Sequence, residues 1–299
     1  TGALVIQHDI DLSAMPGVTV VKVESSRYAM ALMSANLFGN PSRKMTMIGV
    51  TGTKGKTTTT HMIKSVLEAA GRKVGMIGTN GIYYMGRHKE TANTTPESYE
   101  LQKTFREFLD AGCDTALMEV SSQGLMMDRV AGIHYKVGVF TNLYPDHIGP
   151  GEHSSFEEYR SWKGKLFQRC DVGVVNADDP NTEALLEGHT CKLVTYGIHA
   201  PKVDYRASEQ YRLLRNKEML GVEFTLTEPD GHTLDVQVGM PGLFSIYNAL
   251  ATIGVGKVLG LADAPIHEGL KKALVKGRVE LVPISHKFTI LIDLSLIHI

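Results

Sequence analysis

The segment Thr51–Thr60 reads TGTKGKTTTT, a glycine-rich stretch whose residue types could bind phosphate groups. It follows the apolar run Met45–Val50 and opens a helical pattern that continues to Ala70, so it would connect a buried strand to a helix. Glycines let the backbone wrap closely around phosphates, and the N–H groups at the helix N-terminus favour their negative charge. Lys56 would reach the terminal phosphates, and the Thr57 hydroxyl would bind Mg²⁺. The segment therefore predicts a nucleotide site.

The loop departs from the general phosphate-binding pattern G-x-x-x-x-G-K-[ST]. Val50 stands five residues before Gly55, and Gly49 is one place too far away. A glycine-rich turn without a ligand is the structural alternative, but Gly-Lys-Thr-Thr directly after a strand favours a nucleotide site. The guanine-reading pattern Asn-Lys-x-Asp is absent from the sequence, which argues against a GTPase. The loop alone leaves a small-molecule kinase open.

The elements that would position this loop follow from further apolar runs. Four more short apolar runs follow: Val74–Gly78, Thr115–Val120, Val137–Thr141 and Val172–Asn176. Helical patterns, such as Glu97–Ala111, lie between several of these runs. Strands that alternate with helices predict a parallel sheet covered on both faces. We therefore predict an α/β fold, in which a mostly parallel sheet contains the phosphate-binding loop and is flanked by helices.

The pattern changes from about Tyr205. Val222–Leu226 and Thr233–Val238 alternate apolar and polar residues around EPDGH, which predicts an antiparallel hairpin with Asp-Gly at its turn. Two helical patterns follow, Leu243–Leu259 and Pro265–Val275. This part of the chain therefore adds a small antiparallel β element and two helices to the predicted fold.

The composition is that of an ordinary globular protein, with 43% hydrophobic and 21% charged residues among 299. The net charge is -1 with both signs interspersed, which argues against a nucleic-acid partner. Three cysteines are an odd number without paired spacing, so we expect a reducing cytoplasm rather than a disulfide framework. No apolar run approaches the roughly 20 residues of a membrane span. The first residues also lack the pattern of a signal peptide, so no membrane partner is expected.

Both ends of the sequence suggest a fragment. The first residue, Thr1, is not Met, and the last six residues read LSLIHI. These six residues can be encoded by a transposon end sequence that is widely used as a sequencing adaptor. We therefore expect native sequence to stop at about Asp293 and residues 294–299 to be a non-native tail, with an ordinary apolar strand as the alternative.

The string GVTGTKGKTTT resembles the shortened phosphate-binding loop of the Mur ligase family, G-T-x-G-K-T-T. Further segments match in order, and together they resemble the UDP-N-acetylmuramoyl-dipeptide ligase branch of that family. They are NTTPE (93–97), MEVSSQGL (118–125), TNLYPDHIG (141–149), FEEYRSWKGKLF (156–167), NADDP (176–180) and GRVE (277–280). The resemblance covers nearly all of residues 20–293.

Three residues beyond the loop gain a role from this resemblance. Glu119 lies at the end of a predicted parallel strand, where α/β sheets place ligands, and a carboxylate suits Mg²⁺. A solvent-facing or helix-capping Glu is the alternative. The family places a metal-binding His in an Asp-His pair, here at His147. It also places a carbamylated Lys three residues before a Leu-Phe pair, here at Lys163, although a lysine on such a helix would ordinarily be solvated. The expected catalytic set is Lys56, Glu119, His147 and carbamylated Lys163, of which the last three bind metal together with Thr57.

The resemblance also implies contacts to two ligands. On the ATP side these are Gly52, Thr53, Lys54, Gly55, Lys56, Thr57, Thr58, Asn248, Arg278 and Asp293. For the UDP-sugar dipeptide they are Asn93, Thr94, Thr95, Ser121 and Arg129. Hydroxyl and amide groups suit a polar sugar, and an Arg fork suits a carboxylate or phosphate. Two positions depart from the family: Met127 stands where members often carry Gln, and Ser245 stands where they carry Asn.

The reaction that the resemblance implies is ATP-dependent addition of a third amino acid, meso-diaminopimelate or L-lysine, to UDP-MurNAc-L-Ala-D-Glu through an acyl phosphate. The implied setting is peptidoglycan synthesis by a cytoplasmic monomer, and hence cell-wall biogenesis, cell shape and cell division. Within the class, a folylpolyglutamate synthetase-like or cyanophycin synthetase-like ligase is an alternative. From another class, a non-catalytic nucleotide-binding partner is an alternative. The residue that would select between the two amino acids lies outside this sequence.

Mur ligases have three domains, and the resemblance divides the chain among them. Residues 1–44 would be the end of the N-terminal UDP-binding domain, and residues 45–278 the central ATP-binding domain. Residues 279–293 would be the start of the C-terminal domain. We therefore expect the chain by itself to bind ATP weakly at best and not to catalyse ligation.

Overall fold

Six parallel strands form the centre of the computed structural model, which describes residues 2–11, 13, 17–215, 220–275, 277–278, 280–282 and 290–293. They are β3 (Thr46–Thr51), β4 (Val74–Gly78), β7 (Thr115–Glu119), β8 (Tyr135–Phe140), β9 (Cys170–Asn176) and β10 (Lys192–Gly197). Their order across the sheet is β10-β9-β8-β3-β7-β4, so the strand that enters the glycine-rich loop pairs with β7 on one side and β8 on the other. The predicted α/β fold is confirmed.

Further strands extend both edges of this sheet to eleven strands among the described residues. Next to β4 lie β5 (Gly81–Tyr84) and β6 (Arg87–Lys89), each antiparallel to its neighbour. Next to β10 lie β11 (Tyr205–Arg215), β12 (Leu220–Thr227) and β13 (Thr233–Val238). The predicted hairpin is confirmed by the antiparallel pairing of β12 with β13, and it continues the main sheet.

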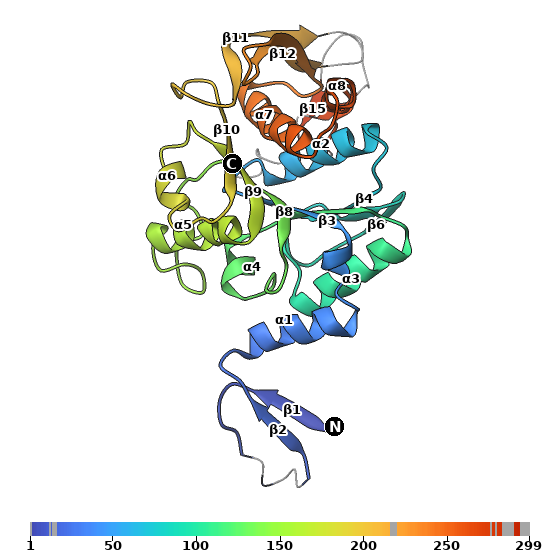
Figure 1. Cartoon of the computed structure of the whole chain (residues 1–299), viewed down its shortest axis with the longest axis vertical. Helices are drawn as coiled ribbons and strands as arrows, with labels where there is room; N and C mark the ends of the chain where they lie inside the picture. The colour runs from blue at the N-terminus through green and yellow to red at the C-terminus, as the bar shows by residue number, and fades with distance from the viewer. Residues whose placement is uncertain are drawn as a thin grey trace.

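Helices cover the two faces of the sheet (Figure 1). On one face, α2 (Lys56–Ala69), α7 (Leu243–Val258) and α8 (Asp263–Lys272) pack over a core that includes Ile63 and Ile246. On the other face, α3 (Ser98–Asp110), α4 (Ser122–Met126) and α5 (Phe156–Gly164) pack over a core that includes Phe105 and Tyr159. The short helices η2 (Lys165–Gln168) and α6 (Thr182–Leu185) complete this side. The helix predicted at Pro265–Val275 corresponds to α8, which begins and ends slightly earlier than predicted.

The first residues form elements that the sequence patterns did not predict. β1 (Ala3–Ile6) and β2 (Thr19–Lys22) make a small parallel pair, separate from the main sheet in Figure 1. The helix α1 (Ser26–Leu37) contacts α3, and η1 (Pro41–Lys44) leads into β3. At the other end, β14 (Glu280–Val282) pairs with β15 (Ile290–Ile292). The proposed domain boundaries remain predictions, and the predicted tail 294–299 lies outside the described residues.

Within the part of the chain that the structure describes, no helix has the length and apolar character needed to cross a bilayer.

Leu117 is a test of the central sheet, because its side chain is completely buried in β7. We expect Leu117→Ala to lower the free energy of unfolding by about 2–5 kcal/mol, since the change removes buried methyl groups and leaves a cavity. Urea denaturation would measure the loss. Leu213→Ala, at a side chain that is 63% exposed, should change stability by less than about 0.5 kcal/mol. Equal losses in the two variants would contradict the assignment of this core.

Candidate active site

The glycine-rich loop between β3 and α2 depends on two glycines. Gly52 has φ +148, and a Cβ placed on it would lie 2.0 Å from Thr141 Oγ1. Gly55 is the N-cap of α2 with φ +84, in the left-handed region that L side chains rarely adopt. The predicted strand–loop–helix arrangement is therefore present, and Gly55 provides no side-chain cap for the first N–H groups of α2.

The segment that follows β8 holds this loop in place. The Thr53 N–H donates to Asn142 O at 2.9 Å, and the Lys54 N–H donates to Asn142 Oδ1 at 2.9 Å. In return, Thr141 Oγ1 donates to Lys54 O at 2.7 Å. These hydrogen bonds fix the loop against the neighbouring strand, so its shape is set before any ligand binds.

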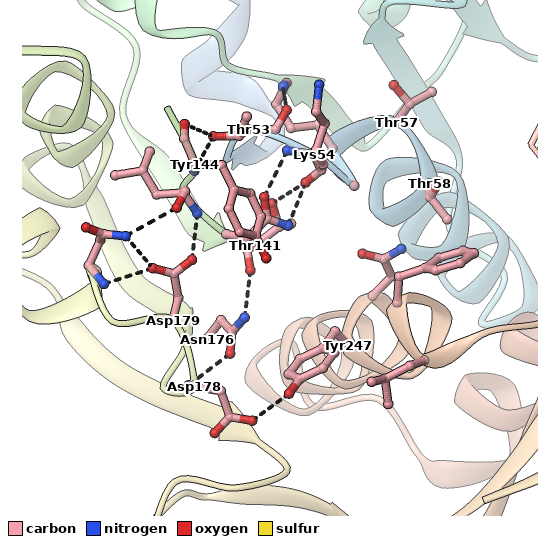
Figure 2. Close-up of a pocket in the computed structure, with 18 of the residues that line it drawn as sticks. Thr53, Lys54, Thr57, Thr58, Thr141, Tyr144, Asn176, Asp178, Asp179 and Tyr247 are labelled. Carbon is pink, nitrogen blue, oxygen red and sulfur yellow. Dashed lines mark hydrogen bonds between the residues drawn. The ribbon is translucent and has the colours of Figure 1, made fainter. Parts of the chain in front are cut away.

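A cavity of about 1160 Å³ lies in front of the loop, bordered by the ends of β8 and β9 and the start of α7 (Figure 2). Its volume suffices for a nucleotide. It is lined by Thr53, Lys54, Gly55, Lys56, Thr57, Thr58, Thr79, Glu119, Thr141, Asn142, Leu143, Tyr144, Pro145, Phe156, Asn176, Asp178, Asp179, Pro180, Asn181, Leu243, Phe244, Tyr247, Asn248, Arg278 and Asp293. The cavity thus brings together every residue predicted on the ATP side except Gly52, which lies at the entrance of the loop.

Lys56 and Lys163 converge on one backbone carbonyl. Lys56 Nζ donates to Gly52 O at 2.9 Å and to Thr53 O at 3.1 Å, and Lys163 Nζ donates to the same Gly52 O at 3.0 Å. Burial lowers the pKa of Lys56. Burial, and then the charge of Lys56, hold the pKa of Lys163 well below its usual range. Two amines therefore share a site that disfavours two positive charges.

Lys163 is only 2% exposed, in contrast to the solvated charge that its helix would ordinarily carry. Its Nζ lies 4.5 Å from the centre of the Tyr159 ring, one turn earlier on α5. The Tyr159 hydroxyl lies 3.0 Å from Thr53 Oγ1, and burial raises the pKa of Tyr159 to about 12. The helix that carries Lys163 is thereby attached to the glycine-rich loop.

Glu119 is 1% exposed at the carboxyl end of β7, where it borders the cavity. Its two carboxylate oxygens accept from the Thr79 N–H at 2.9 Å and from Thr79 Oγ1 at 3.1 Å. Thr57 borders the same cavity at the start of α2. A carboxylate and a hydroxyl are hard oxygen donors, so their chemistry fits Mg²⁺.

His147 follows Tyr144 and Pro145, which line the cavity, but it is not itself among the lining residues. Its backbone has φ 55, a left-handed conformation that is uncommon for a residue with a side chain. Its Nδ1 lies 3.0 Å from Glu152 Oε1, and its ring centre lies 6.0 Å from that of Tyr159. Among the described residues, no three His, Cys, Asp or Glu side chains gather as a metal cluster. Two of the four predicted metal ligands, Thr57 and Lys163, are of other residue types. Metal binding by the predicted set remains a prediction.

The residues predicted to bind the UDP-sugar dipeptide differ in how accessible their side chains are to a ligand. Thr95 is fully buried, and its hydroxyl donates to Glu119 O at 3.0 Å and accepts from the Ser121 N–H at 3.0 Å. Ser121 caps α4 by accepting from the Gly124 N–H. Arg129 donates to Thr95 O at 3.2 Å and pairs with a Glu97 oxygen at 2.7 Å. Thr95 therefore serves to position its neighbours.

Two further predicted substrate residues, Asn93 and Thr94, directly precede Thr95. Asn93 is exposed, and its carbonyl accepts from Thr91 Oγ1 at 3.0 Å. Thr94 Oγ1 lies 3.0 Å from Thr79 Oγ1, the hydroxyl that also donates to Glu119. The contacts of these residues with a substrate remain predictions.

The family profile of the Mur ligase middle domain matches residues 50–256, which include the loop, both lysines and all the residues that line the cavity except Arg278 and Asp293. This chain belongs to the Mur ligase family. A UDP-N-acetylmuramoyl-L-alanyl-D-glutamate–2,6-diaminopimelate ligase from Caldanaerobacter subterraneus subsp. tengcongensis is 40% identical over 98% of this chain and 59% of its own length. Ligases with the same description from Clostridium botulinum and Geobacillus thermodenitrificans are also 40% identical, over 93% and 98% of this chain. The chain spans 59%, 56% and 60% of these three relatives.

Solved structures share the fold of this Mur ligase chain. A UDP-N-acetylmuramoyl-L-alanyl-D-glutamate–2,6-diaminopimelate ligase superposes with a TM-score of 0.78 at 23% identity, covering 91% of this chain and 55% of that one. MurF from Acinetobacter baumannii gives 0.68 at 20% identity, over 97% and 58%. Folylpolyglutamate synthase from Mycobacterium tuberculosis, complexed with ADP and AMPPCP, gives 0.72 at 17% identity, over 89% and 66%. At these identities the likeness establishes the fold.

Several side chains of the cavity in this Mur ligase were not predicted. Asp179 Oδ2 accepts from the Leu143 N–H at 2.6 Å, and Asn176 Nδ2 donates to Thr141 O at 2.8 Å. Asp178 accepts from the Tyr247 hydroxyl at 2.8 Å (Figure 2). Burial alone would raise the pKa of Asp178, but its hydrogen bonds from backbone N–H groups and from Tyr247 lower it overall. The NADDP segment (176–180), which begins at the last residue of β9, was the sequence signal that could have identified these residues.

Gly52→Ala is expected to weaken MgATP binding by about 10-fold or more. Alanine would meet Thr141 and would strain the backbone at a φ of +148, which costs about 1–3 kcal/mol. Isothermal titration of the protein encoded by the complete reading frame would measure the affinity. Gly2→Ala is the control, because nothing lies within 4 Å of a Cβ at Gly2 and its φ is outside the left-handed region. An unchanged affinity in Gly52→Ala would show that the loop does not need this glycine.

Proposed function

We propose that the protein is an ATP-dependent ligase that attaches 2,6-diaminopimelate to UDP-MurNAc-L-Ala-D-Glu. The structural observation that carries this proposal is the convergence of the partly buried Lys56 and the buried Lys163 on Gly52 O, at the edge of a nucleotide-sized cavity that Glu119 also lines. The names of relatives at 40% identity support the substrate and the choice of diaminopimelate over L-lysine. The implied setting is peptidoglycan synthesis in the bacterial cytoplasm by a monomer.

The reaction requires two displacements. The free carboxylate of the dipeptide attacks the γ-phosphorus of ATP, which releases ADP and forms an acyl phosphate. The amine of the incoming amino acid then attacks the acyl carbon, loses a proton and expels inorganic phosphate. Phosphoryl transfer depends mainly on positioning and on neutralising charge, which is the role of Lys56 and of the N–H groups of the loop.

Mg²⁺, when bound, would neutralise charge on the ATP phosphates. Thr57 and Glu119 would hold it from within the cavity, with His147 and carbamylated Lys163 completing the metal ligands. Burial favours the neutral amine of Lys163, which is the form that reacts with CO₂. The nitrogen then forms a bond to carbon and loses a proton, so a potential cation becomes a carbamate anion. That change would also end the repulsion between Lys56 and Lys163.

The UDP-MurNAc-dipeptide would lie on the side of Asn93, Thr94, Ser121 and Arg129, next to Glu119. A folylpolyglutamate synthetase-like activity is the second candidate within the fold. A non-catalytic nucleotide-binding partner is a third, but such a protein would have no need of a buried lysine beside the loop.

Mass spectrometry of the product distinguishes these candidates in the protein encoded by the complete reading frame. With ATP and UDP-MurNAc-L-Ala-D-Glu present, we expect 2,6-diaminopimelate to be incorporated in preference to L-lysine. Incorporation of glutamate into a folate, or no product with any of these substrates, would reject the proposal.

A further inference from the structure

His153 is a buried histidine at the end of an otherwise accessible loop. Residues 144–152 are exposed or partly exposed, whereas the His153 side chain is 0% exposed. Its ring centre lies 5.3 Å from that of Tyr159, and its Nε2 lies 2.9 Å from Ser122 Oγ at the start of α4. Burial lowers the pKa of His153, which favours a neutral ring. A buried imidazole in this position needs a structural or functional reason.

The ring makes one specific hydrogen bond. Nδ1 of His153 is buried and has no hydrogen-bond partner among the residues that the structure describes. A buried acceptor without a partner costs less than a buried N–H without one, so the favoured tautomer carries its proton on Nε2 and donates to Ser122. Ser122 lies three residues after Glu119, so this bond connects the accessible loop to the strand end that borders the cavity.

The backbone of His153 closes the loop that carries His147. The His153 N–H donates to His147 O at 3.1 Å, and the Gly149 N–H donates to His153 O at 3.1 Å. The left-handed backbone of His147 is a conformation that persists only where its surroundings impose it. These two bonds and the buried ring of His153 are the surroundings that the structure provides.

We propose that His153 is a positioning residue, which through its hydrogen bond to Ser122 holds the loop 147–153 so that His147 stays beside Tyr159. This inference rests on the proposed function, in which His147 binds the metal that accompanies ATP. Residues that orient a metal ligand typically change metal affinity by about 10- to 100-fold when they are replaced. Because His153 lies out of reach of the cavity, its effect would pass through His147.

Two substitutions separate the hydrogen bond from the packing. His153→Phe keeps an aromatic ring against Tyr159 but cannot bond to Ser122. His153→Gln loses the ring but keeps an N–H near the position of Nε2. His88→Phe is the matched control, since His88 is exposed on β6.

The probe is Mn²⁺ with the ATP analogue AMP-PNP and bicarbonate, in the protein encoded by the complete reading frame. Electron spin echo modulation reports a histidine nitrogen bound to Mn²⁺. In the unchanged protein and in His88→Phe we expect this signal, and His147→Ala should lose it. His153→Phe should also lose it and bind Mn²⁺ about 10- to 100-fold more weakly, whereas His153→Gln should recover most of both.

The outcomes separate the inference from the proposed function. If His153→Phe keeps the nitrogen signal and the Mn²⁺ affinity, the inference is wrong even when its melting temperature falls. If His153→Phe and His153→Gln lose the signal equally, the bond to Ser122 is not the cause, and the inference is again wrong. If the unchanged protein binds no Mn²⁺ with AMP-PNP, the proposed function itself fails, and the inference fails with it.

Discussion

Lys56→Ala is expected to slow the release of ADP from ATP by about 10²- to 10³-fold, the usual cost of removing one charge-stabilising group from a reacting centre. Lys56 is a partly buried lysine at the start of α2, and its Nζ already lies against the carbonyls of Gly52 and Thr53. Charge interactions are stronger at a buried site than in water, so other cations of the cavity cannot replace it. The rate at saturating ATP and substrate, measured with the protein encoded by the complete reading frame, tests this expectation.

Lys54→Ala provides a matched control two residues away. The Lys54 side chain is 73% exposed and pairs with Asp146 at 3.2 Å. Exposed ion pairs contribute about 0–1 kcal/mol, so the rate should fall by less than about 10-fold. If both variants slow the reaction equally, the effect of Lys56 would reflect a general disturbance of the loop instead of contact with the transferred phosphoryl group.

Lys163→Ala should have the second-largest effect, a loss of about 10²-fold in turnover together with loss of a carbamate. The neutral amine of Lys163 is favoured by burial and by Lys56, so it is the lysine most suited to capture CO₂. With ¹³C-labelled bicarbonate, the unchanged protein should give a carbamate resonance that Lys163→Ala lacks. If the carbamate binds metal as proposed, its loss would also remove several kcal/mol of charge stabilisation, which would account for the loss of turnover.

Lys165→Ala is the control for this experiment. Lys165 begins the 3₁₀ turn after α5, and its Nζ lies 3.4 Å from Gln168 Oε1 at the surface. Its replacement should leave both the carbamate resonance and the turnover intact. A carbamate resonance that survives in Lys163→Ala and disappears in Lys165→Ala would transfer the modification to the other lysine.

The central sheet was predictable because its strands are buried on both faces. Strands such as β4 and β7 read as unbroken apolar runs, and the intervening helices have the expected periodicity. β10 was missed because Lys192 and Leu193 are exposed and Thr195 interrupts its apolar residues. The edge strands β5 and β6 were missed because they are only four and three residues long. Such strands depend on pairing with their neighbours more than on their own residues.

The site was predictable where the local sequence determines the chemistry. The spacing of Gly55, Lys56 and Thr57 after a strand led directly to the loop. The burial of Lys163 could not be read from its helix, because it follows from the packing of α5 against the loop through Tyr159. Asp178 was overlooked for a related reason: an Asp after a strand usually begins a turn, and only the fold places it next to Tyr247.

The release of inorganic phosphate from ATP tests the central claim most directly. The protein encoded by the complete reading frame would be assayed with UDP-MurNAc-L-Ala-D-Glu and 2,6-diaminopimelate together, and with each left out in turn. We expect rapid phosphate release only when both are present, because the acyl phosphate forms on the dipeptide carboxylate and is consumed by the amine. Phosphate release that does not depend on the dipeptide, or no release at all, would contradict the ligase proposed here.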